Sequence, residues 1–233
     1  MGAPVADVGT VLNAGAVAVI TMGPDGVHSS RILSQATAGV AGVPARGDAF
    51  GYSLAASEGY LAVGAPGDAV GPARATGSVA VFRISGTTVT PRARISQSSS
   101  GVPGIAEKHD RFGHAVALGT VCTGVTGVVV GGPGEAIGTS VLAGAAWVVP
   151  LSQSRTCTAR QLYAGHGLPG RPAYGMFLGS SVGVARDAGT SRDTVVIGGA
   201  GDYHKSGRLI TWSTRTHTTL ASRSESVLAL AGR

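Results

Sequence analysis

Residues 47–68 read GDAFGYSLAASEGYLAVGAPGD, and residues 108–135 read KHDRFGHAVALGTVCTGVTGVVVGGPGE. Each stretch has a Phe-Gly pair, followed by an apolar run that ends in Gly, then Ala or Gly, then Pro. A third copy, YGMFLGSSVGVARDAGTSRDTVVIGGAGD at residues 174–202, keeps this order with looser motifs, and Gly2-Ala3-Pro4 matches the end of the pattern. The chain is therefore an internal repeat, which indicates a fold built from similar units.

The spacing of the repeat is steady. Phe50 lies 62 residues before Phe112, and Phe112 lies 65 residues before Phe177. The glycines of the second motif recur at intervals of 62, 67 and 67 residues: Gly2, Gly64, Gly131 and Gly198. Short apolar runs bounded by Gly, Pro and Ser predict four strands per unit, in the second unit at residues 50–56, 60–64, 77–84 and 89–96. Four short strands per repeated unit predict an all-β fold, a β-propeller of four-stranded blades.

These ordered motifs resemble the FG-GAP repeats of integrin-α-like β-propellers, and the resemblance covers nearly the whole chain. It implies one propeller domain over residues 1–233. The run at residues 226–232 looks like the first strand of a unit, whereas the N-terminus begins at a second strand, so one blade is split between the two ends. The predicted units are 1–46 with 224–233, 47–107, 108–173 and 174–223. Integrin-like propellers usually have seven blades, so these four could form a closed ring, half of an eight-bladed dimer, or part of a larger propeller completed by another chain.

Composition narrows the class of protein. The 233 residues suffice for one all-β domain with its own core. The net charge of +6 comes almost entirely from arginines that are scattered over all units, with no basic run or aromatic platform, so we expect no nucleic-acid partner. The charge favours an anionic ligand or surface instead. No apolar stretch is long enough to span a membrane, and no signal peptide precedes the first strand, so either a leader was removed or the protein is cytoplasmic.

The two cysteines bear on the compartment. Cys122 is expected in the turn between the first and second strands of the third unit, and Cys157 near the turn between its third and fourth strands. Both turns lie at the same end of a blade, so a disulfide is feasible, and it would indicate a secreted or extracellular protein. Two unpaired thiols in a cytoplasmic protein are the alternative, because the geometry of a disulfide is demanding.

Calcium is the cofactor that the family resemblance suggests, bound by an Asp-rich loop between the first and second strands. The corresponding loops here are residues 57–59, 119–127 and 186–193, and the first two have almost no carboxylates. The third offers Asp187 and Asp193 without the alternating acidic pattern of a calcium loop. We therefore expect no cofactor, with Asp187 and Asp193 as the one weak candidate for a metal site.

Polar residues gather in two sets of loops. If strands alternate in direction, the loop that enters each unit and the loop between its second and third strands lie at one end, which is the functional end in integrin-like propellers. We predict a ligand site there, formed by Asp48, Arg74, His109, Glu135, Tyr174, Tyr203, His204 and Lys205. Asp48 and Asp110 also have a structural interpretation, because Asp caps tight turns through its side chain.

Two functions of different classes fit these residues. The first is a binding module that presents its loops to a protein, glycan or small-molecule ligand, with a homo-oligomer or second chain completing the ring. The second is a small-molecule enzyme, a lyase, cyclase or hydrolase of a biosynthetic pathway. In that case His114 is the general base, Asp110 orients it and Tyr52 donates a hydrogen bond. We favour the binding module because the sequence contains no recognised catalytic motif.

Overall fold

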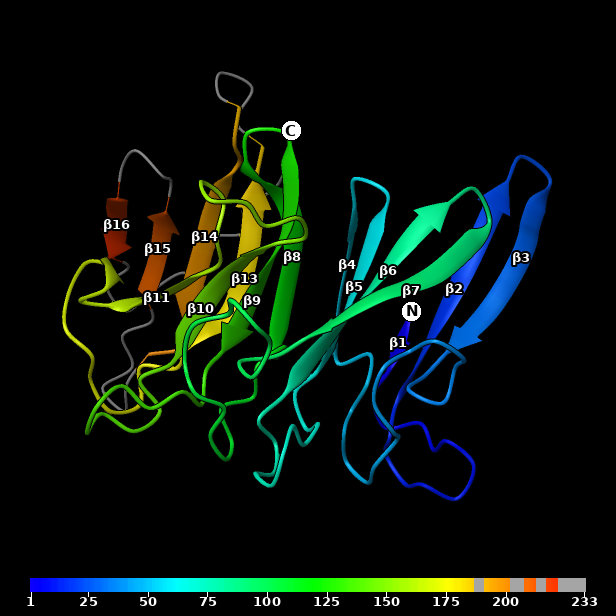
Figure 1. The fold of residues 1–233 in the computed structure, drawn as a ribbon, viewed down its shortest axis with the longest axis horizontal. Helices are drawn as coiled ribbons and strands as arrows, with labels where there is room; N and C mark the ends of the chain where they lie inside the picture. Colours follow the sequence, from blue (N-terminus) through cyan, green and yellow to red (C-terminus); the bar gives the residue numbers. More distant parts are fainter. Residues whose placement is uncertain (187–190, 202–207, 213–216, 222–233) are drawn as a thin grey trace.

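The chain folds into four sheets that follow one another in sequence (Figure 1). A computed structural model describes residues 1–186, 191–201, 208–212 and 217–221. Within these ranges the chain forms strands, turns and loops and no helix, which confirms the predicted all-β class. Consequently no helix in this part of the chain could cross a membrane.

The strands are short, and within each sheet neighbours in sequence are also neighbours in space. All pairs are antiparallel except β11 with β12. The first sheet contains β1 (Gly2–Ala3), β2 (Ala16–Gly23) and β3 (Gly26–Leu33), and the second contains β4 (Ser53–Ser57), β5 (Tyr60–Ala65), β6 (Ser78–Ser85) and β7 (Thr88–Ile95). The third contains β8 (Ala115–Cys122), β9 (Val125–Gly132), β10 (Ala145–Pro150), β11 (Arg160–Ala164) and β12 (Gly167–Leu168), and the fourth contains β13 (Leu178–Ala185), β14 (Thr194–Gly199), β15 (Arg208–Trp212) and β16 (His217–Ala221).

Consecutive sheets pack face to face, because both faces of the middle sheets are apolar. Side chains alternate between the two faces of a strand. In β5, Val63 packs toward Val17 and Leu33 of the first sheet, whereas its neighbour Ala62 packs toward Trp147 of the third sheet. A further apolar cluster joins the third sheet to the fourth. The near-continuous apolar runs of the sequence therefore belong to strands that are covered on both sides.

The two sequence motifs meet where adjacent sheets approach most closely. The N–H of Gly51 donates to the carbonyl oxygen of Gly64 in its own sheet at 3.0 Å. A Cβ on Gly64 would lie only 2.1 Å from the carbonyl oxygen of Gly113 in the next sheet. The same close approach recurs between Gly2 and Gly51, and between Gly131 and Gly179. Glycine is required at these positions because any side chain would collide with the neighbouring backbone.

The third Phe-Gly motif was predicted at the wrong residue. Phe177 does not correspond to Phe50 and Phe112; it adopts a positive φ of 49°, as Ala49 and Arg111 do at 57°. The equivalent residue is Leu178, which is 1 % exposed and donates its N–H to the carbonyl oxygen of residue 143 at 3.0 Å. Phe50 and Phe112 make the corresponding bonds to residues 14 and 76. The shift by one residue arises because Leu, not Phe, fills the apolar position before the glycine.

The first sheet has three strands, and β1 corresponds to the end of β5. The second, third and fourth sheets fall within the units 47–107, 108–173 and 174–223. None of the four sheets closes on itself. Residues 224–233, which we expect to complete the first unit, lie outside the described residues.

Candidate functional site

The expected arrangement of two sets of loops at one end of the sheets is present. Backbone hydrogen bonds tie each entering loop to the second-to-third loop of the preceding sheet. His109 N–H donates to the carbonyl oxygen of Arg74 at 3.1 Å, and Arg111 N–H donates to that of Ala75 at 3.1 Å. We call this region the loop end; it comprises residues 34–52, 96–114 and 165–177, and residues 4–15, 66–77 and 133–144.

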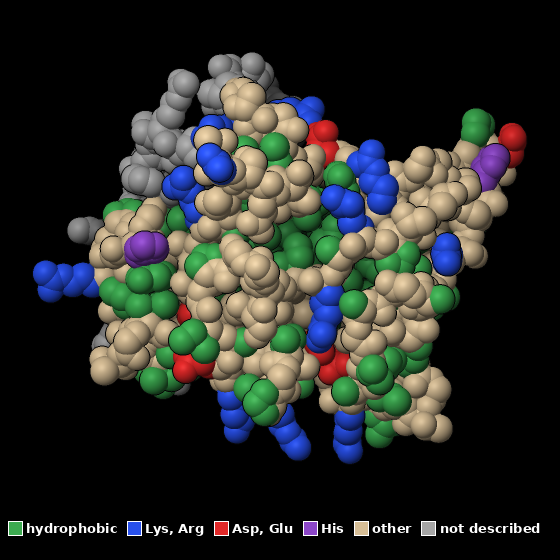
Figure 2. Space-filling view, in the orientation of Figure 1, with side chains coloured by type: hydrophobic (Ala, Val, Ile, Leu, Met, Phe, Trp, Pro, Cys, Tyr) green, Lys and Arg blue, Asp and Glu red, His purple; other side chains and the backbone are tan. Residues whose placement is uncertain are grey.

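The exposed charges of the loop end are mainly positive. Exposed carboxylates among its described residues are those of Asp7 and Glu107, and Asp7 accepts the N–H of Asn13 at 2.8 Å. Figure 2 shows Lys and Arg side chains projecting from the lower edge of the molecule, where Figure 1 places these loops. The exposed cations there are Arg46, Arg74, Lys108, Arg111 and Arg171.

Tyr52 and His114, two residues of the enzyme hypothesis, lie side by side. Each follows a Phe-Gly pair, and their ring centroids lie 4.9 Å apart with the planes tilted by 42°. Tyr52 is 49 % exposed and His114 is half-buried. Burial lowers the pKa of His114, and the positive charge of Arg111 lowers it further. The imidazole is therefore neutral at neutral pH and offers one donor and one acceptor nitrogen.

Asp48 and Asp110 lie inside the loop end rather than on its surface. They are 1 % and 2 % exposed. Each accepts the backbone N–H three residues earlier, from Ala45 at 2.7 Å and from Glu107 at 2.5 Å. These carboxylates cap the turns of the entering loops, as their structural interpretation predicted. Within the described chain no hydrogen bond joins Asp110 to His114, so Asp110 does not orient the imidazole.

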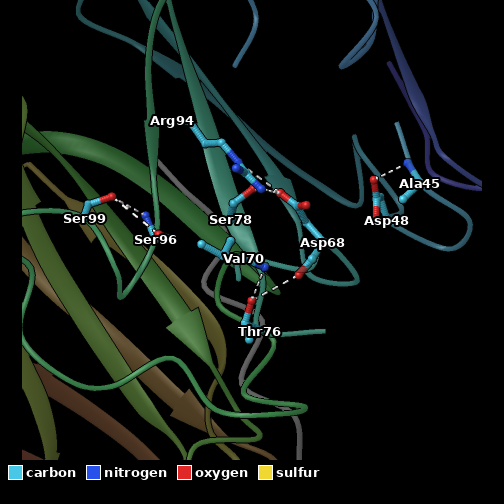
Figure 3. A network of polar contacts seen from close by, with 9 residues as sticks. All are labelled: Ala45, Asp48, Asp68, Val70, Thr76, Ser78, Arg94, Ser96 and Ser99. Carbon is cyan, nitrogen blue, oxygen red and sulfur yellow. Dashed lines mark hydrogen bonds and ion pairs between the residues drawn. The ribbon is translucent and has the colours of Figure 1, made fainter. Parts of the chain in front are cut away.

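Two further carboxylates sit beneath the loops, and the first is neutralised by a cation. Arg94 on β7 forms an ion pair with Asp68, and Ser78 donates its hydroxyl to the same carboxylate (Figure 3). Thr76 continues the network by donating to the carbonyl oxygen of Asp68 at 3.2 Å. Val70 N–H in turn donates to the Thr76 hydroxyl at 2.9 Å. The network fixes the loop that joins β5 to β6.

Glu135 occupies the same position in the third sheet, but two amides replace the cation. Gln97 and Gln161 each donate from Nε2 to the Glu135 carboxylate at 2.8 Å. Burial, and after it the nearby Asp110, raises the pKa of Glu135 to about 7. Burial likewise raises the pKa of Asp48 and of Asp110 to about 6. The interior of the loop end therefore exchanges protons near neutral pH.

Sequence reasoning did not single out the partners of these acids. Arg94, Gln97 and Gln161 come from the fourth strands or from the residues that follow them. The repeat itself could have indicated two of them, because Arg94 and Gln161 occupy corresponding positions on the fourth strands. Arg94 pairs with Ala80 in the second sheet, and Gln161 pairs with Trp147 in the third. Their contacts with Asp68 and Glu135 depend on distances between strands and loops that a linear pattern does not contain.

The remaining predicted site residues lie at other places in the fold or outside the described residues. Tyr174 is 54 % exposed on the entering loop of the fourth sheet. Asp193 lies at the opposite end of the sheets and accepts the N–H of Thr120 at 2.7 Å. No group of three or more metal-binding side chains occurs among the described residues. Four predicted residues lie outside the described ranges: Asp187, Tyr203, His204 and Lys205.

The cysteines form the disulfide that was one of the two sequence alternatives. The S–S distance between Cys122 and Cys157 is 2.05 Å, and their Cα atoms lie 6.1 Å apart. The bond connects the end of β8 to segment 151–159, opposite the loop end.

Neither a protein-family profile nor any curated protein matches this sequence.

Proposed function

We propose that this chain is a binding module, a β-propeller of the FG-GAP type whose loop end binds an acidic partner protein. The four sheets are consecutive blades in this proposal. Their sequential order, their three to five strands each and the repeated glycine contacts support it. The observation that carries the binding function is the excess of exposed cations over exposed carboxylates at the loop end.

The charge of the loop end has a structural cause. Asp68 is paired with Arg94, and Glu135, Asp48 and Asp110 are buried with raised pKa values. These acids therefore do little to offset the arginines and lysine at the surface. Loops held by a rigid scaffold are the usual place for binding residues, and a one-sided charge attracts a partner of opposite sign.

The test compares two double variants of equal net charge. Arg74→Ala with Lys108→Ala removes two cations from the loop end, whereas Arg155→Ala with Arg160→Ala removes two exposed cations elsewhere. The probe is a fluorescent oligo-glutamate peptide, with oligo-glutamine as the neutral control, measured by anisotropy at low and high salt. We expect the first variant to bind roughly tenfold more weakly and the second to bind like wild type. Equal weakening in both variants would mean that peptide affinity depends only on net charge, and it would refute a site at the loop end.

The contact between Tyr52 and His114 favours a second candidate, a small-molecule enzyme with His114 as general base. A neutral imidazole beside a phenol has the chemistry that proton transfer requires. The orienting role expected for Asp110 is not part of this proposal, because the Asp110 carboxylate accepts the backbone N–H of Glu107 instead. The test is turnover of a panel of small esters and lactones by wild type and His114→Ala. Hydrolysis at the same rate by both proteins excludes His114 as the base.

The propeller proposal also predicts that a further sheet covers the outer face of the first sheet. Val17 and Leu33 pack toward the second sheet. The neighbouring Ile20 and Ile32 are 43 % and 66 % exposed, and Met22 is 65 % exposed. In a propeller such a face packs against the preceding blade, from the same chain in a closed ring or from a second chain. Molar mass in solution separates these two cases.

The disulfide supports a secreted or extracellular location, because structural disulfides persist in oxidising compartments. The expected result is that protein folded under oxidising conditions contains no free thiol by mass spectrometry. Protein purified from its natural source with two free thiols would argue for the cytoplasm.

A further inference from the structure

A hollow opens between the second and third sheets, and Ser99, Ser100 and Val102 of the loop end form part of its lining. It has a volume of about 310 Å³. That size is at the lower end of the roughly 300–1,000 Å³ typical of small-molecule sites. Its floor includes Ile95, Val102 and Val149, which are all buried. Figure 2 shows a hollow near the middle of the face, with hydrophobic side chains inside and Lys or Arg side chains at its edges.

The hollow exists because the third sheet lacks a tight outer hairpin. In the second sheet, β6 and β7 pair up to Ser85 and Thr88, which are joined by a two-residue turn. In the third sheet, β10 ends at Pro150 and β11 begins only at Arg160. Segment 151–159 spans the difference and contributes Leu151 and Gln153 to the rim. The disulfide at Cys157 holds this segment in place.

Gly39 and Gly101 occupy equivalent positions, beside the second sheet and beside the third sheet respectively. A Cβ on Gly39 would lie 3.4 Å from Cγ of Pro91, which is ordinary van der Waals contact. The equivalent Gly101 instead faces the polar end of Gln153, with its Cβ position 2.8 Å from Oε1. The two junctions therefore have different neighbours at this position, Pro91 in the first and Gln153 in the second.

A β-bulge places Arg92 at the rim. Val81 pairs with Ala93 and Phe82 pairs with Pro91, so Arg92 is the extra residue of β7. Bulges redirect a side chain from the regular alternation of a strand. Arg92 Nη2 reaches across to the carbonyl oxygen of Leu151 at 3.5 Å. Among the described residues no carboxylate pairs with Arg92, so its charge is available to a ligand.

We propose that this hollow binds a small amphipathic carboxylate, with the apolar group on the floor and the carboxylate against Arg92. Ser100 and Gln153 at the rim add polar groups that can hydrogen-bond the head group. A guanidinium holds a carboxylate by charge-assisted hydrogen bonds, and apolar area covered by the floor adds to the affinity. The exposed cations of the loop end do not line this site, and its ligand is a small molecule rather than a protein.

Octanoate is the probe, and octanol is its uncharged counterpart. Binding is followed by NMR titration of the backbone amides, which also locates the site. We expect octanoate to shift signals of residues 92–102 and 149–153 and to bind at least about tenfold more tightly than octanol. Arg92→Met should reduce octanoate affinity to that of octanol and leave octanol binding unchanged. Arg160→Ala, which removes an exposed arginine of β11 outside the hollow, should bind both like wild type.

A second variant tests the shape of the hollow separately from its charge. Ala93 is exposed and lines the hollow, so Ala93→Phe fills space without displacing core residues. We expect it to abolish binding of both probes while the unfolding temperature stays within a few degrees of wild type. Shifts confined to other regions, undiminished octanoate binding by Arg92→Met, or undiminished binding by Ala93→Phe would each overturn the proposal. Oligo-glutamate binding is independent of these results, so failure here leaves the loop-end proposal intact.

Discussion

Gly64 lies against the carbonyl oxygen of Gly113 so closely that a Cβ on Gly64 would stand 2.1 Å from that oxygen. One glycine comes from the Gly-Ala-Pro motif of the second sheet, and the other comes from the Phe-Gly motif of the third. The backbones of the two sheets are therefore in direct contact at this point. This relationship explains why the two motifs recur together: each supplies one side of the same contact.

Gly64→Ala should destabilise the protein severely. The neighbouring atom is backbone, so it cannot move aside as a flexible side chain would, and we expect a loss of about 3 kcal/mol or more in the free energy of unfolding. Gly183→Ala is the control, because the nearest atom to its Cβ would be 3.9 Å away. Urea denaturation of the two variants measures the difference. Equal stability of Gly64→Ala and wild type would mean that the sheets do not approach as described.

Stability should fall as the pH rises from about 4.5 to about 7. Burial raises the pKa of Glu135 from 4.5 to about 7, so in this range the unfolded chain has released a proton that the folded chain still holds. Deprotonation then favours unfolding, and the contribution of Glu135 alone is on the order of 3 kcal/mol. Denaturant titrations across this range measure the slope.

Glu135→Gln isolates that contribution. The variant keeps the volume and removes the titrating proton, so it should gain stability relative to wild type at pH 8 and not at pH 4.5. Asp48 and Asp110 still titrate, with pKa values raised to about 6, so part of the slope should persist. A variant whose slope matches that of wild type would show that Glu135 is not the group responsible.

Arg94→Gln should make the second sheet resemble the third. Asp68 is 5 % exposed at its side chain and has Arg94 as its cation. Removing one partner of a buried ion pair costs about 3–5 kcal/mol, because the remaining charge is left without compensation. Arg155→Gln, at an exposed arginine that forms no ion pair with any described residue, should change stability little in the same urea denaturation.

Reducing the disulfide should lower stability by about 3–4 kcal/mol, because the bond closes a loop between residues 35 apart. Thermal unfolding of wild type with and without a reductant measures the effect. The double variant Cys122→Ser with Cys157→Ser should match the reduced wild type and show no response to the reductant. The loss should also weaken octanoate binding, since segment 151–159 forms part of the hollow. The same unfolding temperature with and without the reductant would contradict a stabilising role of the disulfide.

Several features followed from residue patterns alone. The all-β class, the strands of the second unit and the shared end of the two loop sets are as predicted. The third Phe-Gly motif was placed one residue early, because Phe177 resembles the motif while Leu178 occupies the packed position. The sequence motif is recognised by residue type, whereas the packed position depends on which side chain the neighbouring sheet can cover.

The sequence by itself determined the repeat, because close approach of two backbones demands glycine and this demand is visible at Gly2, Gly64 and Gly131. The tertiary structure determined which groups the polar residues contact. Gln97 reaches Glu135 from 38 residues away and from a different unit, and Arg92 faces the hollow only because a bulge turns it there. Such contacts depend on distances between loops and strands of neighbouring sheets. Local residue patterns do not encode those distances, and they become defined only when the sheets pack.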